Sequence, residues 1–273
     1  MRFAPVPVLV LALLLAGCGA APSPEQAVSD TGEKTAEAGS ARIVVSYYRA
    51  ETVVGAFDFD HGSGVLDANE ITQRTIITPD FVYELISDEL RIDSSRRPKW
   101  LKWELSAMPP MLLEPFASSP RELFAFFSAA NAPEEVGEGE ERGDPVTRYA
   151  ATVDIERFLA TVPADVRADM RDAFLDYWPV ATEGAPVQLA LDSDGRLRRA
   201  DVVTYDGEEI VVEIFDYGVE VDATAPPASE VITWAEYEKL LRKECEALKK
   251  KGLEKTMPHC VGGCSAGEEE GEA

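Results

Sequence analysis

A cysteine near the start of the chain carries the clearest chemical signal in the sequence. Leu15-Ala16-Gly17-Cys18 matches the bacterial lipobox, in which small residues precede a cysteine. Small residues let the chain enter a signal peptidase, and the thiol of Cys18 would then form a thioether with diacylglycerol. The alternative is an ordinary secretory signal with a coincidental cysteine. We expect residues 1–17 to be a lipoprotein signal peptide and Cys18 to be lipidated.

The residues before Cys18 fit this prediction. Arg2 supplies a positive charge, and an apolar run interrupted only by Pro7 follows at 6–15. A run of roughly ten residues is too short to span a bilayer core of about 30 Å as a helix. Palmitate or similar acyl chains would instead anchor the protein to the extracytoplasmic face of the cell membrane. Residues 18–24 then form a lipidated tether.

The other three cysteines lie near the C-terminus, at Cys245, Cys260 and Cys264. An odd number outside the cytoplasm favours one disulfide with a leftover thiol, or no essential bridge. His259 precedes Cys260, but the spacing is not the C-x-x-C of redox motifs, and no spacing demands a zinc site. We therefore expect a possible disulfide among these cysteines, and neither a metal nor a cofactor.

Acid–base chemistry has one weak candidate, formed by Asp58, Asp60 and His61. The chain has only two histidines, and neither a G-x-S-x-G nor an S-x-x-K motif is present. The sequence from Asp58 to Gly64 is more typical of a strand that runs into a turn. We therefore predict that the protein is not an enzyme.

The charge of the chain excludes one class of partner. Lys and Arg total 26 against 50 Asp and Glu, which gives a net charge of −24. Such an acidic surface repels phosphate backbones, so we expect no nucleic-acid partner. Apolar residues make up 45% of the 273 residues, which is enough to fold around a core.

The spacing of apolar residues predicts several helices and a series of short strands, and these elements position the residues named above. Helices are expected at 25–39, 120–127 and 155–176, the last broken at Pro163. Strands are expected at 42–48, 53–59, 71–78, 81–86, 99–105, 142–153, 187–191, 197–205 and 209–217, with turns at 60–64, 94–98, 192–195 and 205–207. This spacing favours an α+β fold with a curved antiparallel sheet of about ten strands and helices on its concave face.

The C-terminal region adds one more helix. Thr233 and Glu236 have the spacing of a capping box, and apolar residues from Trp234 onward recur at helical spacing. We predict a main domain at 25–231, a C-terminal helix at 232–252, and a disordered acidic tail with two cysteines at 253–273.

The concave face of the sheet is the predicted ligand site. If the helices leave space over it, that space is apolar and suits an acyl chain; otherwise the core is filled. The period of two along each strand suggests a lining of aromatic and branched residues, namely Phe57, Phe59, Tyr83, Tyr149, Leu189 and Ile214. In an empty cavity, Leu189→Trp would block the ligand, whereas in a packed core it would cost about 1–3 kcal/mol.

Several stretches taken together resemble the LolA-like lipoproteins of actinobacteria, which include the LppX/LprG lipid carriers. Two of them are Thr78-Pro79-Asp80 and Asp192-Ser193-Asp194-Gly195. The full set of matching segments is 33–42, 77–83, 99–100, 136–137, 141–149, 153–154, 192–199, 216–221 and 225–227. Taken in this order, the segments span most of the chain after Cys18.

This resemblance implies a half-open β-barrel wrapped on an N-terminal helix and closed by further helices over a hydrophobic cavity. It also implies a membrane-anchored protein that binds or transports a lipid, a glycolipid or another hydrophobic ligand without catalysis. A non-catalytic surface or signalling adaptor with a filled core is the alternative function. The helix from Thr233 and the three cysteines near it extend beyond the usual end of such a domain.

Overall fold

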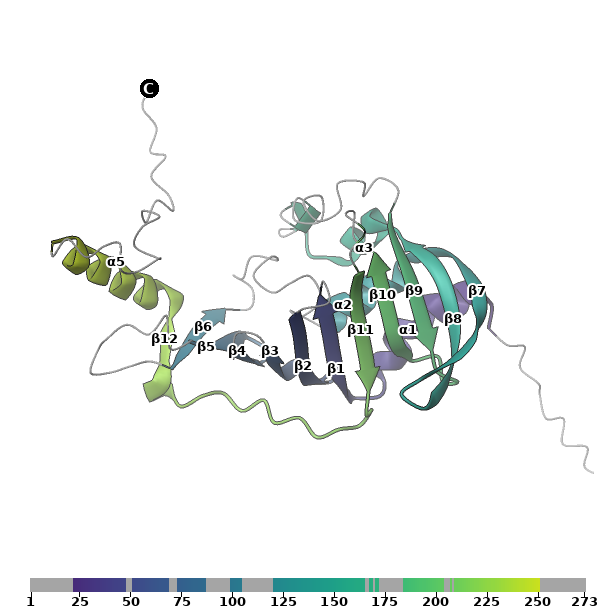
Figure 1. The fold of residues 1–273 in the computed structure, drawn as a ribbon, viewed down its shortest axis with the longest axis horizontal. Helices are drawn as coiled ribbons and strands as arrows, with labels where there is room; N and C mark the ends of the chain where they lie inside the picture. Colours follow the sequence, from purple (N-terminus) through teal and green to yellow (C-terminus); the bar gives the residue numbers. More distant parts are fainter. Residues whose placement is uncertain are drawn as a thin grey trace, which may run out of the picture.

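One open sheet of twelve strands organises the fold (Figure 1). This computed structural model describes residues 22–47, 51–68, 73–86, 99–104, 120–164, 167–168, 170–171, 184–203, 207 and 209–250. The strand order is β12-β6-β5-β4-β3-β2-β1-β11-β10-β9-β8-β7. Neighbouring strands run antiparallel, except for the parallel pair of β12 and β6. The α+β class with a curved, open antiparallel sheet is therefore confirmed.

Two meanders make up this sheet, and they meet in its middle. The first comprises β1 Ser40–Tyr47, β2 Glu51–Asp58, β3 Ser63–Ala68, β4 Gln73–Ile77, β5 Phe81–Leu85 and β6 Trp100–Glu104. The second comprises β7 Ala130–Glu141, β8 Asp144–Val153, β9 Ala185–Leu191, β10 Leu197–Val203 and β11 Glu209–Phe215. Strand β11 pairs with β1, with Ile214 directly opposite Ile43. The last strand, β12 Val231–Thr233, adds to the end of the first meander.

Three of these strands, β3, β7 and β12, were not expected from the sequence. β12 includes Ile232 and Thr233, which were predicted to belong to the C-terminal helix. β3 has only six residues, with Gly64 and Asp67 among them, so its alternation is weak. β7 contains Pro133 and a row of glutamates, which are unfavourable in a central strand. It is the last strand of the described sheet, where one side of the backbone pairs with no other described strand, and such residues are tolerated there.

Four α-helices accompany the sheet in the described part of the chain. They are α1 Pro24–Ala36, α2 Pro120–Ser128, α3 Ile155–Thr161 and α5 Trp234–Lys250; a short 3-10 helix, Ala228–Glu230, precedes β12. α1 begins at Pro24, with the side chain of Ser23 accepting a hydrogen bond from the backbone of Gln26 at 3.3 Å. α3 ends just before Pro163, where the sequence predicted a break.

Hydrogen bonds fix α1 to the hairpin of β9 and β10. The hydroxyl of Thr35 accepts from the backbone N–H of Leu197 at 2.9 Å and donates to the carbonyl of Thr31 at 2.6 Å. The hydroxyl of Tyr217 donates to the carbonyl of Leu197. Burial raises the pKa of Tyr217, so this hydroxyl keeps its proton and the bond persists at neutral pH. α1 is therefore held against the second meander.

The described residues contain two separate hydrophobic cores. The larger one joins α1, α2 and α3 to the sheet and includes the fully buried Phe127, Val153 and Leu159. The smaller one has only four buried members, Ile86, Leu101, Ile232 and Tyr237, and it seats α5 on β6 and β12. β12 crosses the predicted domain boundary at residue 231, and it places α5 beside the same sheet.

Candidate functional site

The strand register defines one continuous apolar face of the sheet. Directly opposed residues in antiparallel strands point to the same side, and residues two apart on a strand also share a side. On β1, Ile43 therefore shares a face with Ile214 of β11. The same face continues through β10 to Leu189 of β9 and Tyr149 of β8. We call this side of the sheet the inner face.

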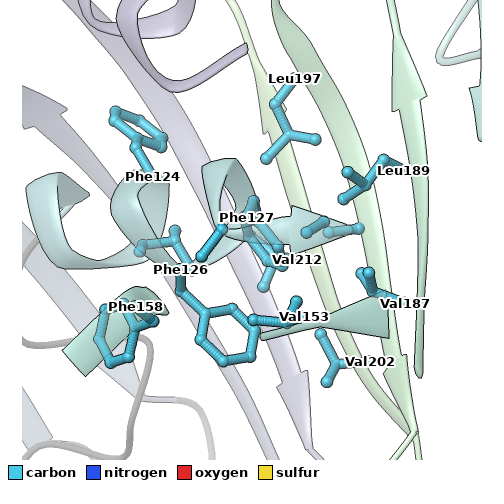
Figure 2. Packing of buried hydrophobic residues seen from close by; sticks show 14 of the residues in the cluster. Phe124, Phe126, Phe127, Val153, Phe158, Val187, Leu189, Leu197, Val202 and Val212 are labelled. Carbon is cyan, nitrogen blue, oxygen red and sulfur yellow. The ribbon is translucent and has the colours of Figure 1, made fainter. Parts of the chain in front are cut away.

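Helices α2 and α3 cover the inner face at the second meander with aromatic side chains. Phe126 packs edge-on against Phe127 and Phe158, with ring centroids 5.5 Å apart in both pairs. The rings of Phe126 and Phe127 point toward the valines and leucines of β9, β10 and β11, and Phe158 lies beyond Phe126 (Figure 2). Each such burial is worth about 1.5–3 kcal/mol. Protein side chains thus occupy this part of the inner face.

Close helix packing completes this cover. A Cβ added at Gly32 of α1 would lie 2.5 Å from Oγ of Ser128 and 3.0 Å from the carbonyl oxygen of Phe124. Only glycine therefore lets α1 approach α2 so closely. At the first meander, Phe59 packs edge-on against Phe124 with ring centroids 5.1 Å apart, which ties the end of β2 to α2.

Five of the six predicted lining residues lie on the inner face. Phe57, Tyr149, Leu189 and Ile214 are buried members of the larger core, and the half-buried Phe59 packs against it. The structure therefore brings these five together, as the period of two predicted. Whether any of them contacts a ligand stays a prediction.

The placement of Tyr83 was predicted wrongly. Val82 of β5 is directly opposite Ile77 of β4, Ile77 is opposite Gly64 of β3, and Gly64 is opposite Phe57 of β2. Val82 therefore lies on the inner face, and so does Glu84, which is two residues further along β5. Tyr83 lies on the other side, opposite Ile76 and Lys102. The period of two groups Tyr83 with Phe81 and Leu85, but it does not show which side of β5 faces inward, and this is the reason for the error.

The inner face extends beyond the helices α1, α2 and α3. On β3, β4 and β5 it carries Leu66, Ile77 and Val82, all of them buried. Among the described elements, none of the helices makes extended contact with these three strands. Leu66, Ile77 and Val82 nevertheless belong to the same buried core as the residues of α1, α2 and α3, so protein atoms already cover them.

Trp103 of β6 joins the two hydrophobic cores. Its ring packs against members of both, and it stacks on Trp234 of α5 with centroids 4.6 Å apart and planes 19° apart. Trp234 also contacts Tyr237 at a centroid distance of 5.9 Å. Since Trp103 is opposite Val82 on the inner face, α5 covers the same side of the sheet as the other helices, at its far end.

A half-buried carboxylate lies next to this aromatic junction. The indole N–H of Trp103 donates to Oε2 of Glu84 at 3.0 Å. Burial raises the pKa of Glu84, and the hydrogen bond from Trp103 partly opposes that shift. Sequence reasoning missed Glu84; the available signal was the mainly apolar composition of β5, in which a single carboxylate interrupts the run.

The acid–base candidate, by contrast, forms a turn. The backbone N–H of His61 donates to one oxygen of Asp58 at 2.9 Å, and Nδ1 of His61 lies 2.8 Å from the other. Burial opposes ionisation of Asp58, but the hydrogen bonds from His61 prevail and lower its pKa. His61 is largely exposed, so this pair fixes the connection between β2 and β3.

The described residues contain neither a metal-binding cluster nor a membrane-spanning helix. No group of three His, Cys, Asp or Glu in them could hold a metal ion. None of the described helices is both long and apolar enough to span a bilayer.

Cys245 lies on α5 and is disulfide-bonded. Cys18, Cys260, Cys264 and the predicted tail fall outside the described residues, so the pairing stays a prediction.

Solved structures with a similar chain path include bacterial lipoproteins. LprF from Mycobacterium bovis is 13% identical, with 76% of this chain and 99% of that chain covered at a TM-score of 0.49. The Mycobacterium tuberculosis lipoprotein LppX is also 13% identical, with 72% and 98% covered at 0.44. A LolA superfamily protein from Nitrosomonas europaea is 11% identical, with 73% and 94% covered at 0.25.

The likeness concerns the path of the chain and does not identify a ligand. No protein-family model and no curated protein matches the chain.

Proposed function

We propose that this protein is a lipoprotein, anchored through Cys18 to the extracytoplasmic face of the cell membrane, that binds or transports a lipid or another hydrophobic ligand. The ligand lies on the inner face of the sheet. No residue has a catalytic role in this proposal, and no metal, cofactor or nucleic acid is required.

The extent of the inner face is the observation that supports ligand binding. Its apolar side chains continue onto β3, β4 and β5, past the phenylalanines that fill the space over the second meander. Leu66, Ile77 and Val82 are already buried in the larger core, so in this proposal the ligand enters when the side chains above them move apart, and its acyl chain then lies in a wholly apolar environment.

The predicted lining residues divide under this proposal. Phe57 and Phe59 lie at the border between the second meander and β3, so they are the ones we place against the ligand. Tyr149, Leu189 and Ile214 lie deeper, among core residues of the second meander. They support the ligand-binding strands without contacting the ligand.

Native mass spectrometry of the purified full chain tests the proposal directly. The expected result is a population heavier than the protein by the mass of a non-covalently bound lipid, which organic extraction removes. Delipidated protein should then take up a neutral fluorescent apolar probe. A bare mass together with no probe uptake would reject ligand binding.

The adaptor alternative draws on a different observation. The interlocked rings of Phe126, Phe127 and Phe158 make the second meander a solid core, as an adaptor with no cavity would have. In that case the chain acts through its surface, and a protein partner takes the place of the lipid. The probe experiment separates the two functions.

Membrane attachment has its own test. Cys18→Ala should release the protein into the medium or leave an uncleaved precursor, while the wild-type N-terminal peptide should carry the mass of the acyl chains. A wild-type peptide without that mass would refute the anchor and leave ligand binding open.

A further inference from the structure

We propose that Glu84, Thr75 and Trp103 form a polar subsite on the inner face that accepts a hydroxyl group of a neutral amphiphile and excludes fatty-acid carboxylates. This inference rests on the proposed function, because it specifies the class of hydrophobic ligand that the same face takes.

The strand register places the three side chains together. Thr75 of β4 is directly opposite Glu84 of β5, so their side chains lie on the same side of the sheet. Trp103 reaches the same point from β6, because its indole nitrogen lies 3.0 Å from Oε2 of Glu84. The group is surrounded by the apolar Ile77 and Val82, which are almost fully buried.

The hydrogen bond from Trp103 leaves acceptor capacity on the carboxylate. In the described part of the chain, this indole is the hydrogen-bond partner of Glu84, and it occupies Oε2 alone. Oε1 is left to accept a bond from a ligand. A hydroxyl suits it, because it donates one bond and accepts another, and the hydroxyl of Thr75 can complete the second.

Charge accounts for the exclusion of fatty acids. A fatty-acid carboxylate would meet the like charge of Glu84 in a partly desolvated place, which is unfavourable. The cation on the same stretch of β6 does not compensate, since Lys102 lies on the opposite face, 3.4 Å from the ring centroid of Phe81. The net charge of −24 disfavours the anion further.

The stacked indoles form one wall of this subsite. The ring of Trp103 is fixed on one side by Trp234 and at its nitrogen by Glu84. A carboxylate held in this way is already oriented when the ligand arrives, which reduces the entropy cost of binding. The subsite therefore fixes where along β4–β6 the polar end of the ligand lies.

Competition among three amphiphiles with the same acyl chain tests the inference. The probes are 1-monooleoylglycerol, which has hydroxyls, oleate, which has a carboxylate, and methyl oleate, which has neither. Each displaces the neutral reporter N-phenyl-1-naphthylamine from the full chain at about pH 8, where oleate is ionised. We expect 1-monooleoylglycerol to bind about tenfold more tightly than methyl oleate, with oleate the weakest.

Two substitutions assign the effect to Glu84. Glu84→Gln keeps an acceptor but removes the charge, so oleate should gain about tenfold while 1-monooleoylglycerol changes little. Glu84→Leu removes the acceptor, so 1-monooleoylglycerol should fall to the level of methyl oleate. Glu104→Gln is the matched control, because Glu104 is an exposed carboxylate of β6 on the other face, opposite Phe81; it should leave all three affinities unchanged.

The outcomes separate this inference from the proposed function. If the reporter binds the wild type but the ratio of oleate to 1-monooleoylglycerol is the same in Glu84→Gln, the subsite is wrong and ligand binding stands. If the reporter and all three amphiphiles fail to bind the wild type, both are wrong. Should Glu84→Leu not fold, the near-isosteric Glu84→Gln decides through that ratio alone.

Discussion

The two ends of the sheet are stabilised in very different ways. At the second meander, α1, α2 and α3 bury a large core of interlocked rings, with Phe127 and Leu159 wholly inaccessible. At the other end, α5 rests on four buried residues and on the stack of Trp103 with Trp234, the latter still 42% exposed. The strands between these ends carry the proposed ligand.

The large core at the second meander stabilises the fold, whereas the small core under α5 can open locally. Because stability grows with buried apolar area, the large core supplies most of the free energy of unfolding. The small core contributes little, so α5 can open at low cost while the sheet stays intact. Trp103 is the contact through which such opening would reach the ligand face.

The largest effect should come from removing a ring of the large core. Phe127→Ala is expected to cost about 3–5 kcal/mol of unfolding free energy, because the side chain is fully buried and leaves a cavity. Denaturant unfolding measures this. Tyr237→Ala in the small core is the comparison, and it should cost clearly less. Equal losses at the two sites would contradict the division into a strong and a weak end.

Overpacking distinguishes the filled part of the inner face from the ligand-bearing part. Leu189→Trp and Ile214→Trp add volume in the large core and should each cost about 1–3 kcal/mol, with lipid binding retained. Leu66→Trp on β3 should block lipid uptake as well as overpack the core, since Leu66 is also buried there. Thermal melting and native mass spectrometry measure the two effects. Lost lipid in Leu189→Trp with an unchanged melting temperature would place the ligand in the second meander instead.

A local effect is expected at the start of α5. The hydroxyl of Thr233 accepts from the backbone N–H of Glu236 at 3.3 Å, and the carboxylate of Glu236 accepts from the backbone N–H of Thr233 at 3.1 Å. Thr233→Ala removes the first bond and should cost about 1 kcal/mol, confined to α5. Hydrogen exchange should speed up in α5 and not in α2. Thr233→Ser retains the hydroxyl and is the control.

The smallest expected effect is a pH dependence from Glu84. Burial raises its folded-state pKa above the ordinary 4.5, so folding favours the protonated form. Below both pKa values the group has no effect, and its destabilising contribution develops as pH rises through the interval between them. Glu84→Gln should therefore melt slightly higher than the wild type near pH 7, with the difference vanishing near pH 4. Glu104→Gln should show no such trend.

Much of this architecture follows from local sequence patterns. The capping box at Thr233 and Glu236 forms as its spacing predicted, because both partners lie within one turn of helix. The hairpin at Asp192–Gly195 forms because Asp192 accepts bonds from the backbone of its own turn and Gly195 adopts a positive φ of 80°. Such features depend only on neighbouring residues, so one sequence is enough.

The errors arise where neighbours distant in sequence decide the outcome. β7 is a strand because β8 pairs with it, although its own residues disfavour strands. Tyr83 was assigned to the wrong face because the environment of Glu84 depends on Trp103, nineteen residues further on. The candidate site shows the same limit: the period of two predicted which residues of a strand share a side, and Phe57, Leu189 and Ile214 do lie in one core, but it could not show how far side chains fill that face.

The glutamates of β7 have a consequence for how copies of the protein meet one another. An open sheet ends in a strand whose free backbone groups invite another strand, and this tendency drives aggregation. Here Glu134, Glu135, Glu138 and Glu140 are all exposed along that strand. Two copies that approached edge to edge would bring their rows of negative charge together. Electrostatic self-repulsion therefore protects the open end of the sheet, and it allows the sheet to stay unclosed without edge-to-edge polymerisation.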